Sequence, residues 1–252
     1  MLNNHATSDF DAWEPSPDRL ELAEDEIHVW RASIDCEEIV LRQFDATLST
    51  DEKARAERFL FPRDRNRFVA VRGILRELLG RYVSRPPADL KFEYGPQGKP
   101  GLRVNLPQGS VQFNVSHSHG VALLAFALGR HLGVDVEWVR PDFATEHIAE
   151  RYFSPQEVME LRRLPPSLQD EGFFLCWTRK EAYIKALGGG LTVPLDSFQV
   201  SLTPGKPEEL RAANSSHWSL RSLRPDQRYV GALVVEGNAW QLCGWDWRAN
   251  HS

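Results

Sequence analysis

One long helix, predicted over 171–187, places the strongest limits on how this chain can fold. After Gly172 the segment contains neither proline nor glycine, and it stops at Gly188-Gly189-Gly190, a typical helix end. At about 100° per residue, the apolar side chains that share one face are Phe173, Trp177, Ile184 and Leu187. We therefore expect this face to be buried.

Three charged residues lie on or beside this apolar face. Lys180 falls inside it, Glu181 on its edge, and Lys185 one turn beyond Glu181. Charge at the rim of a buried face costs free energy unless it is paired, so we expect a metal, an anion or another side chain beside it. The alternative is an ordinary Glu-Lys pair, four residues apart on a solvated face.

A second charged pattern lies in the segment 133–138. Its apolar residues alternate with Asp135 and Glu137, which predicts a strand with both carboxylates on one face. Like charges side by side repel, and a bridging divalent cation would relieve the repulsion. Oxygen ligands suit Mg²⁺ or Mn²⁺ better than zinc. The alternative is the solvated face of an edge strand, although Glu181 would complete a three-carboxylate site.

Two loops carry further polar groups. Alternation over 111–116 and the apolar run 121–128 predict a hairpin whose tip is His117-Ser118-His119-Gly120. A histidine at such a tip more often makes hydrogen bonds or contacts an anion than binds a metal. The turn-rich segment 94–101 lets the backbone approach a flat ligand, and Lys99 adds a cation there.

An excess of basic residues marks two helices predicted near the start of the chain. The first begins at Ser49, a cap with Glu52 three residues later, and runs to Phe59 before Pro62; the second covers 65–83. Nine basic residues face four acidic ones over 52–81, a net charge of +5: Lys53, Arg55, Arg58, Arg63, Arg65, Arg67, Arg72, Arg76 and Arg81 against Glu52, Glu57, Asp64 and Glu77. They form either a solvated helix face or an anion site.

Composition excludes several classes of protein. The chain has 252 residues and a net charge of −5, which disfavours a general nucleic-acid binder. Its three cysteines show no metal-ligand spacing, and their odd number fits a reducing compartment. With no recognisable leader and no apolar run longer than 121–128, we expect a cytoplasmic protein without membrane contact.

The remaining elements repeat a simple order. Residues 1–25 are polar, acidic and proline-containing, which predicts a loose extension. A long helix followed by strands occurs twice, near Arg65 and near Glu171, as a faint internal echo. The other predicted elements are strands over 26–34, 197–202, 218–223, 229–235 and 240–245, and helices over 143–150 and from the Ser154 cap with Pro155.

Taken together, three motifs in this order and spacing resemble the 4'-phosphopantetheinyl transferases of the surfactin-synthetase-activating type. Two further matches are Gly98-Lys99-Pro100 and Pro194-Leu195-Asp196-Ser197-Phe198, and the similarity covers about 49–202. The three motifs are Phe113-Asn114-Val115-Ser116-His117-Ser118, Gly133-Val134-Asp135-Val136-Glu137, and Trp177-x-x-Lys180-Glu181-Ala182-x-x-Lys185.

The resemblance implies an α+β fold in which two similar subdomains, 26–130 and 131–252, form a pseudo-twofold pair within a monomer. Coenzyme A and Mg²⁺, with Mn²⁺ as the alternative, would lie in the cleft between them. The enzyme would move the 4'-phosphopantetheine arm to a serine of an acyl or peptidyl carrier protein, as a holo-[acyl-carrier-protein] synthase does. The second product would be adenosine 3',5'-bisphosphate.

The resemblance also implies roles for individual residues. The metal ligands would be Asp135, Glu137 and Glu181. Glu181, as base, and Lys185 would be the catalytic residues. The coenzyme A contacts would be Arg67, Lys99, Pro100, Ser116, His117, Lys180 and Lys185. The 3'-phosphate contact remains open among Lys53, Arg55 and Arg58.

Two other functions use the same residues. One is a metal-dependent phosphodiesterase or nuclease, although the acidic balance of the chain disfavours a nucleic-acid substrate. The other is a non-catalytic module that binds coenzyme A or a carrier, which would not need all three carboxylates. Which carriers are served does not follow from the sequence.

Overall fold

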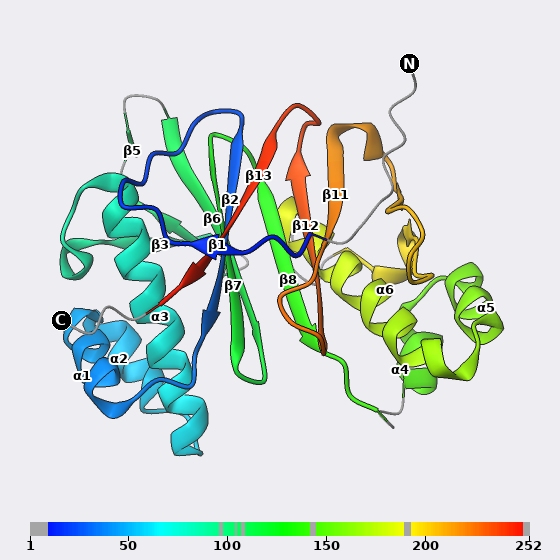
Figure 1. Cartoon of the computed structure of the whole chain (residues 1–252), viewed down its shortest axis with the longest axis horizontal. Helices are drawn as coiled ribbons and strands as arrows, with labels where there is room; N and C mark the ends of the chain where they lie inside the picture. The colour runs from blue at the N-terminus through cyan, green and yellow to red at the C-terminus, as the bar shows by residue number, and fades with distance from the viewer. Residues whose placement is uncertain are drawn as a thin grey trace.

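Each half of the chain folds in the same order: one strand, three helices, and a hairpin whose last strand returns beside the first (Figure 1). The computed structural model describes residues 10–95, 98–103, 105–106, 109–141, 145–188 and 193–248. The first half contains β2 (Glu26–Ser33), α1 (Glu38–Thr47), α2 (Thr50–Ala56), α3 (Pro62–Val83), β6 (Gly109–Ser118) and β7 (Val121–Leu128). The second contains β8 (Leu132–Trp138), α4 (Thr145–Tyr152), α5 (Pro155–Arg163), α6 (Pro166–Leu187), β11 (Trp218–Leu223) and β12 (Tyr229–Glu236).

The repeated order produces the same strand arrangement twice, β2-β7-β6 and β8-β12-β11. The α+β class and the internal echo are therefore confirmed. The first sheet is extended to β1-β13-β2-β7-β6-β5 by β1 (Glu14–Pro15), β5 (Asn105–Leu106) and β13 (Gln241–Trp247). The shorter elements are η1 (Pro87–Asp89), β3 (Phe92–Tyr94), β4 (Pro100–Leu102), η3 (Leu195–Ser197), β9 (Gln199–Val200), β10 (Leu210–Arg211) and η4 (Ser215–His217).

Helices cover the outer faces of two sheets that face each other, so the layers run helix, sheet, sheet, helix (Figure 1). Alternation along the strands explains this order. In β7, Leu124 and Phe126 join the core beneath α3, whereas Leu123 and Ala125 join the core between the sheets. The third core lies beneath α6. Within the described part of the chain, no helix combines the length and hydropathy needed to cross a membrane.

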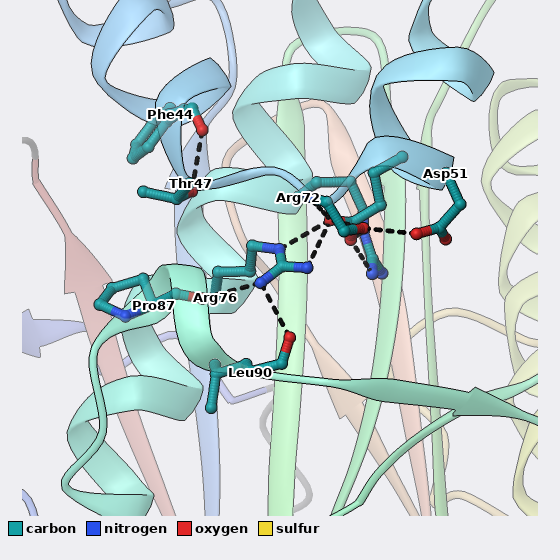
Figure 2. A network of polar contacts seen from close by, with 9 residues as sticks. Phe44, Thr47, Asp51, Arg72, Arg76, Pro87 and Leu90 are labelled. Atoms are coloured by element: carbon teal, nitrogen blue, oxygen red, sulfur yellow. Dashed lines mark hydrogen bonds and ion pairs between the residues drawn. The ribbon is translucent and has the colours of Figure 1, made fainter.

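Helices α3 and α6 correspond position by position. Both have 22 residues and begin with proline, and the fifteenth residue of each is a fully buried cation, Arg76 or Lys180. Arg76 donates to the carbonyls of Pro87 and Leu90 (Figure 2). Lys180 donates to the carbonyls of Leu195 and Phe198 at 2.8 and 2.7 Å. Each cation therefore fastens its helix to the turn that follows it.

The glutamates that neutralise these cations come from helix caps. Ser49 and Ser154 begin capping boxes with Glu52 and Glu157, as the sequence predicted. Glu52 pairs with Arg72 and Arg76, and Glu157 pairs with Lys180 at 2.8 Å. Two of the nine basic residues over 52–81, Arg72 and Arg76, are thus used inside the protein. Pro62 begins α3, and α2 ends at Ala56, earlier than predicted.

Two features depart from the predicted subdomains. Strand β13 pairs in parallel with β2, so the last strand of the second subdomain completes the sheet of the first. The predicted loose extension is ordered from Phe10 onward: Phe10 and Trp13 contact the core between the sheets, and β1 pairs with β13. These pairings satisfy the backbone N–H and C=O groups of strand edges that would otherwise be open. The sequence pattern does not show which strands have open edges.

Smaller differences concern element ends. The strand predicted over 197–202 is only Gln199–Val200 and follows a short 3-10 helix. The helix predicted over 143–150 is observed as Thr145–Tyr152, and its first predicted residues lie outside the described part. Helix α6 ends at Gly188 with φ of 68°, as predicted, but Leu187 is 38 % exposed because it lies past the covered part of the helix.

Candidate active site

The predicted carboxylates of β8 lie where the two halves meet. Gly133 allows the close contact with α6, because a Cβ there would lie 2.1 Å from the carbonyl oxygen of Ala182. Two residues on, Asp135 is 4 % exposed, and its Oδ1 accepts from Lys185 Nζ and Ser116 Oγ, each at 2.7 Å. Its Oδ2 is buried without a hydrogen-bond partner. An oxygen of this kind calls for an additional ligand.

Glu137 and Glu181 stand in the electric field of Asp135. Burial raises the pKa of both carboxyls, and the charge of Asp135 raises each further. Glu137 accepts one hydrogen bond, from Ser118 Oγ at 2.7 Å. Three coupled carboxyls repel one another, and a cation between them would remove the repulsion.

This donor set fits a hard divalent cation such as Mg²⁺, because it consists of carboxylate oxygens and includes one buried oxygen that lacks a partner. The three carboxylates do not form a compact ligand set in this structure. Within the described part of the chain, they are not among the groups of three possible ligand atoms that lie within 4.8 Å of one another. Binding would therefore require the three carboxylates to move closer together.

Lys185 makes a different pair from the local one that the sequence allowed. Its Nζ lies 2.7 Å from Asp135 Oδ1 and donates to the carbonyl of Val134 at 3.2 Å. The partner is thus 50 residues away on β8 rather than Glu181 one turn back. Lys185 remains 26 % exposed, so its ammonium can still contact an anion from solvent.

The prediction that Lys180 contacts coenzyme A is wrong for this structure. Its side chain is fully buried, pairs with Glu157, and uses its remaining donors on two carbonyls. Helical periodicity had placed it correctly on the buried face. Its partner is a capping glutamate rather than a ligand, because Glu157 comes from the preceding helix and is invisible to that periodicity.

His117 lies close enough to Asp135, Lys185 and Arg67 to feel the charge of each. Burial lowers the pKa of His117, and the positive charges of Lys185 and Arg67 lower it further, although the residue is exposed at the surface. Arg67 makes a bidentate ion pair with Asp35 at 2.7 and 2.8 Å, and this pair holds the pKa of Asp35 below its usual range. An anion bound by Arg67 would compete with Asp35.

The loop that carries Lys99 and Pro100 joins the two halves. Lys99 Nζ donates to the carbonyl of Lys185 at 2.8 Å and to that of Leu132 at 3.1 Å, so it links the start of β8 to the end of α6. Burial lowers the pKa of Lys99 to about 8. Pro100 pairs with Tyr94 across β3 and β4. Residues 96–97 of the loop lie outside the described part.

The candidates for the 3'-phosphate separate in the structure. Lys53 pairs with Asp45 at 3.4 Å. Arg55 and Arg58, by contrast, line a cavity of about 540 Å³, together with Asp51, Phe59 and Tyr94. The cavity offers cations and aromatic surface in one place.

A separate group of possible metal ligands is satisfied without an ion. Glu26, His28 and Cys243 lie within 4.8 Å of one another on β2 and β13. Trp30 Nε1 donates to the Tyr82 hydroxyl, which lies 2.8 Å from His28 Nδ1, and His28 Nε2 lies 3.1 Å from Glu26. A proton on Nε2 satisfies this chain, whereas a metal there would leave the Tyr82 hydroxyl proton without an acceptor. We interpret the group as structural.

Sequence reasoning missed three residues that hold the site. Asp35 and Glu157 lie far along the chain from their partners, Arg67 and Lys180, and nothing local marks them. Ser118 could have been found, because it continues the alternation of Asn114 and Ser116 on β6.

Comparison with known proteins gives matches along almost the whole chain. The family model for the 4'-phosphopantetheinyl transferase superfamily matches residues 131–234, and the model for the 4'-phosphopantetheinyl transferase N-terminal region matches residues 30–128. The 4'-phosphopantetheinyl transferase HetI of Nostoc sp. is 44% identical over 233 residues, 92% of this chain and 97% of that protein.

Other matches are more distant. The 4'-phosphopantetheinyl transferase Sfp of Bacillus subtilis is 31% identical over 160 residues, 64% of this chain and 69% of that protein. A holo-(acyl-carrier-protein) synthase from Bacillus anthracis, solved with coenzyme A (3',5'-ADP), aligns with a TM-score of 0.38 and 22% identity. That alignment covers 43% of this chain and 96% of that one.

Proposed function

The chain belongs to the 4'-phosphopantetheinyl transferase superfamily, and we propose that it transfers the 4'-phosphopantetheine arm of coenzyme A to a serine of an acyl or peptidyl carrier protein. The observation that carries this proposal is the environment of Asp135. Its carboxylate is buried where the halves meet, Lys185 and Ser116 hold one oxygen, and the other oxygen has no partner. Both halves of the site come from one chain.

The reaction exchanges one phosphorus–oxygen bond for another. The serine oxygen bonds to the phosphorus nearest the pantetheine, the bond from that phosphorus to the bridging oxygen breaks, and adenosine 3',5'-bisphosphate leaves. The serine proton needs an acceptor. Glu181, which is largely buried beside Asp135, is the candidate acceptor, directly or through a water molecule.

The other residues would bind either the metal or the cosubstrate. Asp135, Glu137 and Glu181 would hold Mg²⁺, which neutralises charge on the pyrophosphate when bound. The pyrophosphate would lie against Lys185, His117 and Arg67, whereas Arg55 and Arg58 would receive the 3'-phosphate at their cavity. Lys99 and Pro100 would border the adenine, and Ser116 would keep Asp135 in place while facing the cosubstrate.

Mass spectrometry of an unmodified carrier tests the function. We expect enzyme, coenzyme A and Mg²⁺ to add about 340 Da, the mass of the arm, to the carrier. Release of nucleotide without added mass would indicate a phosphodiesterase, and binding without either product would indicate a non-catalytic module. The same assay over fatty-acid, polyketide and nonribosomal-peptide carriers would identify the substrates. Omitting Mg²⁺ tests the metal requirement.

The Lys185→Met variant should lower kcat by about a hundredfold and change the KM for coenzyme A much less. The charge on the pyrophosphate oxygens redistributes as the bond breaks, so a fixed cation stabilises the transition state more than the bound state. Steady-state kinetics measures both constants. Lys185→Arg keeps the positive charge and should retain more activity. A lower melting temperature with unchanged kcat would assign Lys185 only to the pair with Asp135.

Coenzyme A affinity should fall as the pH rises through about 8 if the charge of Lys99 attracts the cosubstrate, because Lys99 loses its proton there. A free lysine stays charged to about pH 10, and phosphates finish titrating near pH 6, so neither explains a change in this range. Lys99→Met should remove the pH dependence. Calorimetric titration between pH 7 and 9 measures it.

Loss of folding would not imitate this effect. The pKa of Lys99 is lower in the folded protein than in the unfolded chain, so keeping Lys99 protonated lowers the free energy of unfolding below about pH 8. This destabilisation disappears as the pH rises above about 8, so the protein becomes more stable rather than less. Equal slopes of affinity against pH for the wild type and Lys99→Met would contradict the role.

A further inference from the structure

Strands β6 and β8 belong to different sheets, and β8 is an edge strand of its sheet. The contacts between them are made by side chains of β6 rather than by backbone hydrogen bonds between the two strands. Asn114 Oδ1 accepts from the Val134 amide at 2.8 Å. Ser116 Oγ donates to Asp135 and Ser118 Oγ donates to Glu137, each at 2.7 Å. The last three alternate residues of β6 thus hold either the backbone of β8 or one of its carboxylates.

Ser118 makes two hydrogen bonds of opposite sense. Its Oγ accepts from the Trp138 amide at 3.2 Å and donates to Glu137 Oε2. An amide can only donate, so the single hydroxyl proton is left for the carboxylate. One oxygen of Glu137 is therefore held by Ser118, and its second oxygen can face a cation.

The hairpin tip fixes Ser118 on the end of β8. His119 adopts the left-handed region with φ of 53°, which is uncommon for a residue other than glycine. Its ring stacks on Trp138 at 4.2 Å between centroids, and the Gly120 amide donates to the Ser118 carbonyl at 2.8 Å. The ring contact and the turn together hold the hairpin tip, and with it Ser118, beside Glu137.

We propose that Ser118 is a positioning residue that orients Glu137 toward the divalent cation. This inference rests on the proposed function, because it assumes a cation among Asp135, Glu137 and Glu181. Ser118 touches neither the cation nor the reacting atoms in this arrangement. Its removal should therefore weaken metal binding before it affects coenzyme A. A purely structural role would lower stability and leave metal affinity unchanged.

The test measures Mn²⁺ binding to the full chain by electron paramagnetic resonance, without any turnover. Ser118→Ala should bind Mn²⁺ about tenfold more weakly than the wild type, the usual size of effect when a group that orients a metal ligand is lost. Ser118→Thr keeps the hydroxyl and should restore most of the affinity. Ser110→Ala, on the same strand but with a hydroxyl that accepts from Gln112, is the matched control and should bind as the wild type does.

Each result of these Mn²⁺ measurements either supports or contradicts the positioning role of Ser118. Unchanged Mn²⁺ affinity in Ser118→Ala, or no Mn²⁺ binding by the wild type, would overturn the inference. If Ser118→Ala does not fold, Ser118→Cys keeps the volume with a weak donor and should show the same loss. A wild type that binds Mn²⁺ but leaves carriers unmodified would refute the proposed function and leave the positioning role testable. At saturating metal, coenzyme A affinity should stay within about twofold in Ser118→Ala.

Discussion

Asp135→Asn should lower carrier modification at least about a hundredfold while the chain stays folded, because loss of a group that merely orients a ligand already costs about 10–100-fold. The substitution keeps the shape of the side chain and an oxygen that can accept from Lys185 and Ser116. It removes the charge that holds the cation and places an amide where the unpartnered Oδ2 lies. Carrier modification at saturating coenzyme A, followed by mass spectrometry, measures the loss.

The control is Asp89→Asn, an exposed aspartate on η1 far from β8 in the chain. It should retain full activity. Mn²⁺ affinity should fall in Asp135→Asn and not in the control. Near-normal transfer by folded Asp135→Asn would refute the assignment of Asp135 as a metal ligand, and loss of activity with unchanged Mn²⁺ affinity would move its role to the pair with Lys185.

Local rules explain what could be predicted from the sequence. The Ser154-Pro155 start of α5, the glycine end of α6 and the alternation of β8 each depend on residues within one turn or two strand steps. The same locality placed Asp135 and Glu137 together, because side chains two apart on a strand must share a face. The link to Glu181 was only a hypothesis until the family resemblance supported it, since no local rule brings α6 to β8.

The parts that could not be predicted depend on long-range pairing. Strand β13 was expected as a strand, but its parallel pairing with β2, more than 200 residues earlier in the chain, has no local signal. The arm around Phe10 and Trp13 looked loose because its composition is polar, yet two aromatic rings pack against the inter-sheet core and Phe10 exchanges backbone hydrogen bonds with Ser222 and Arg224. Composition averages over a segment, whereas burial is decided by individual side chains.

Lys180 shows the same limit inside the site motif. Periodicity identified a cation on a buried face and predicted that something must pair with it. Periodicity could not decide whether that partner is a bound ligand or another side chain of the protein. The correspondence of α3 and α6 supplies the answer, because Arg76 in the same helical position also pairs with a capping glutamate. The lysine of the motif that contacts Asp135 is Lys185.

Lys180→Met should destabilise the folded chain by about 3–5 kcal/mol, the usual cost when one partner of a buried pair is removed. Methionine fills a similar volume but leaves Glu157 charged and 2 % exposed, and it frees the carbonyls of Leu195 and Phe198. Urea denaturation followed by fluorescence measures the change. Below the transition, the KM for coenzyme A should match the wild type, because the Lys180 side chain is fully buried.

Combining Lys180→Met with Glu157→Gln isolates the pair. Glutamine keeps the length of Glu157 and one oxygen that can accept from the Ser154 amide, so the cap of α5 is partly preserved. With no uncompensated charge left inside, the double variant should be more stable than the sum of the two single losses implies, by about 1–3 kcal/mol. Additive losses would mean that the two charges do not stabilise each other. A raised KM for coenzyme A in folded Lys180→Met would instead return Lys180 to the binding site.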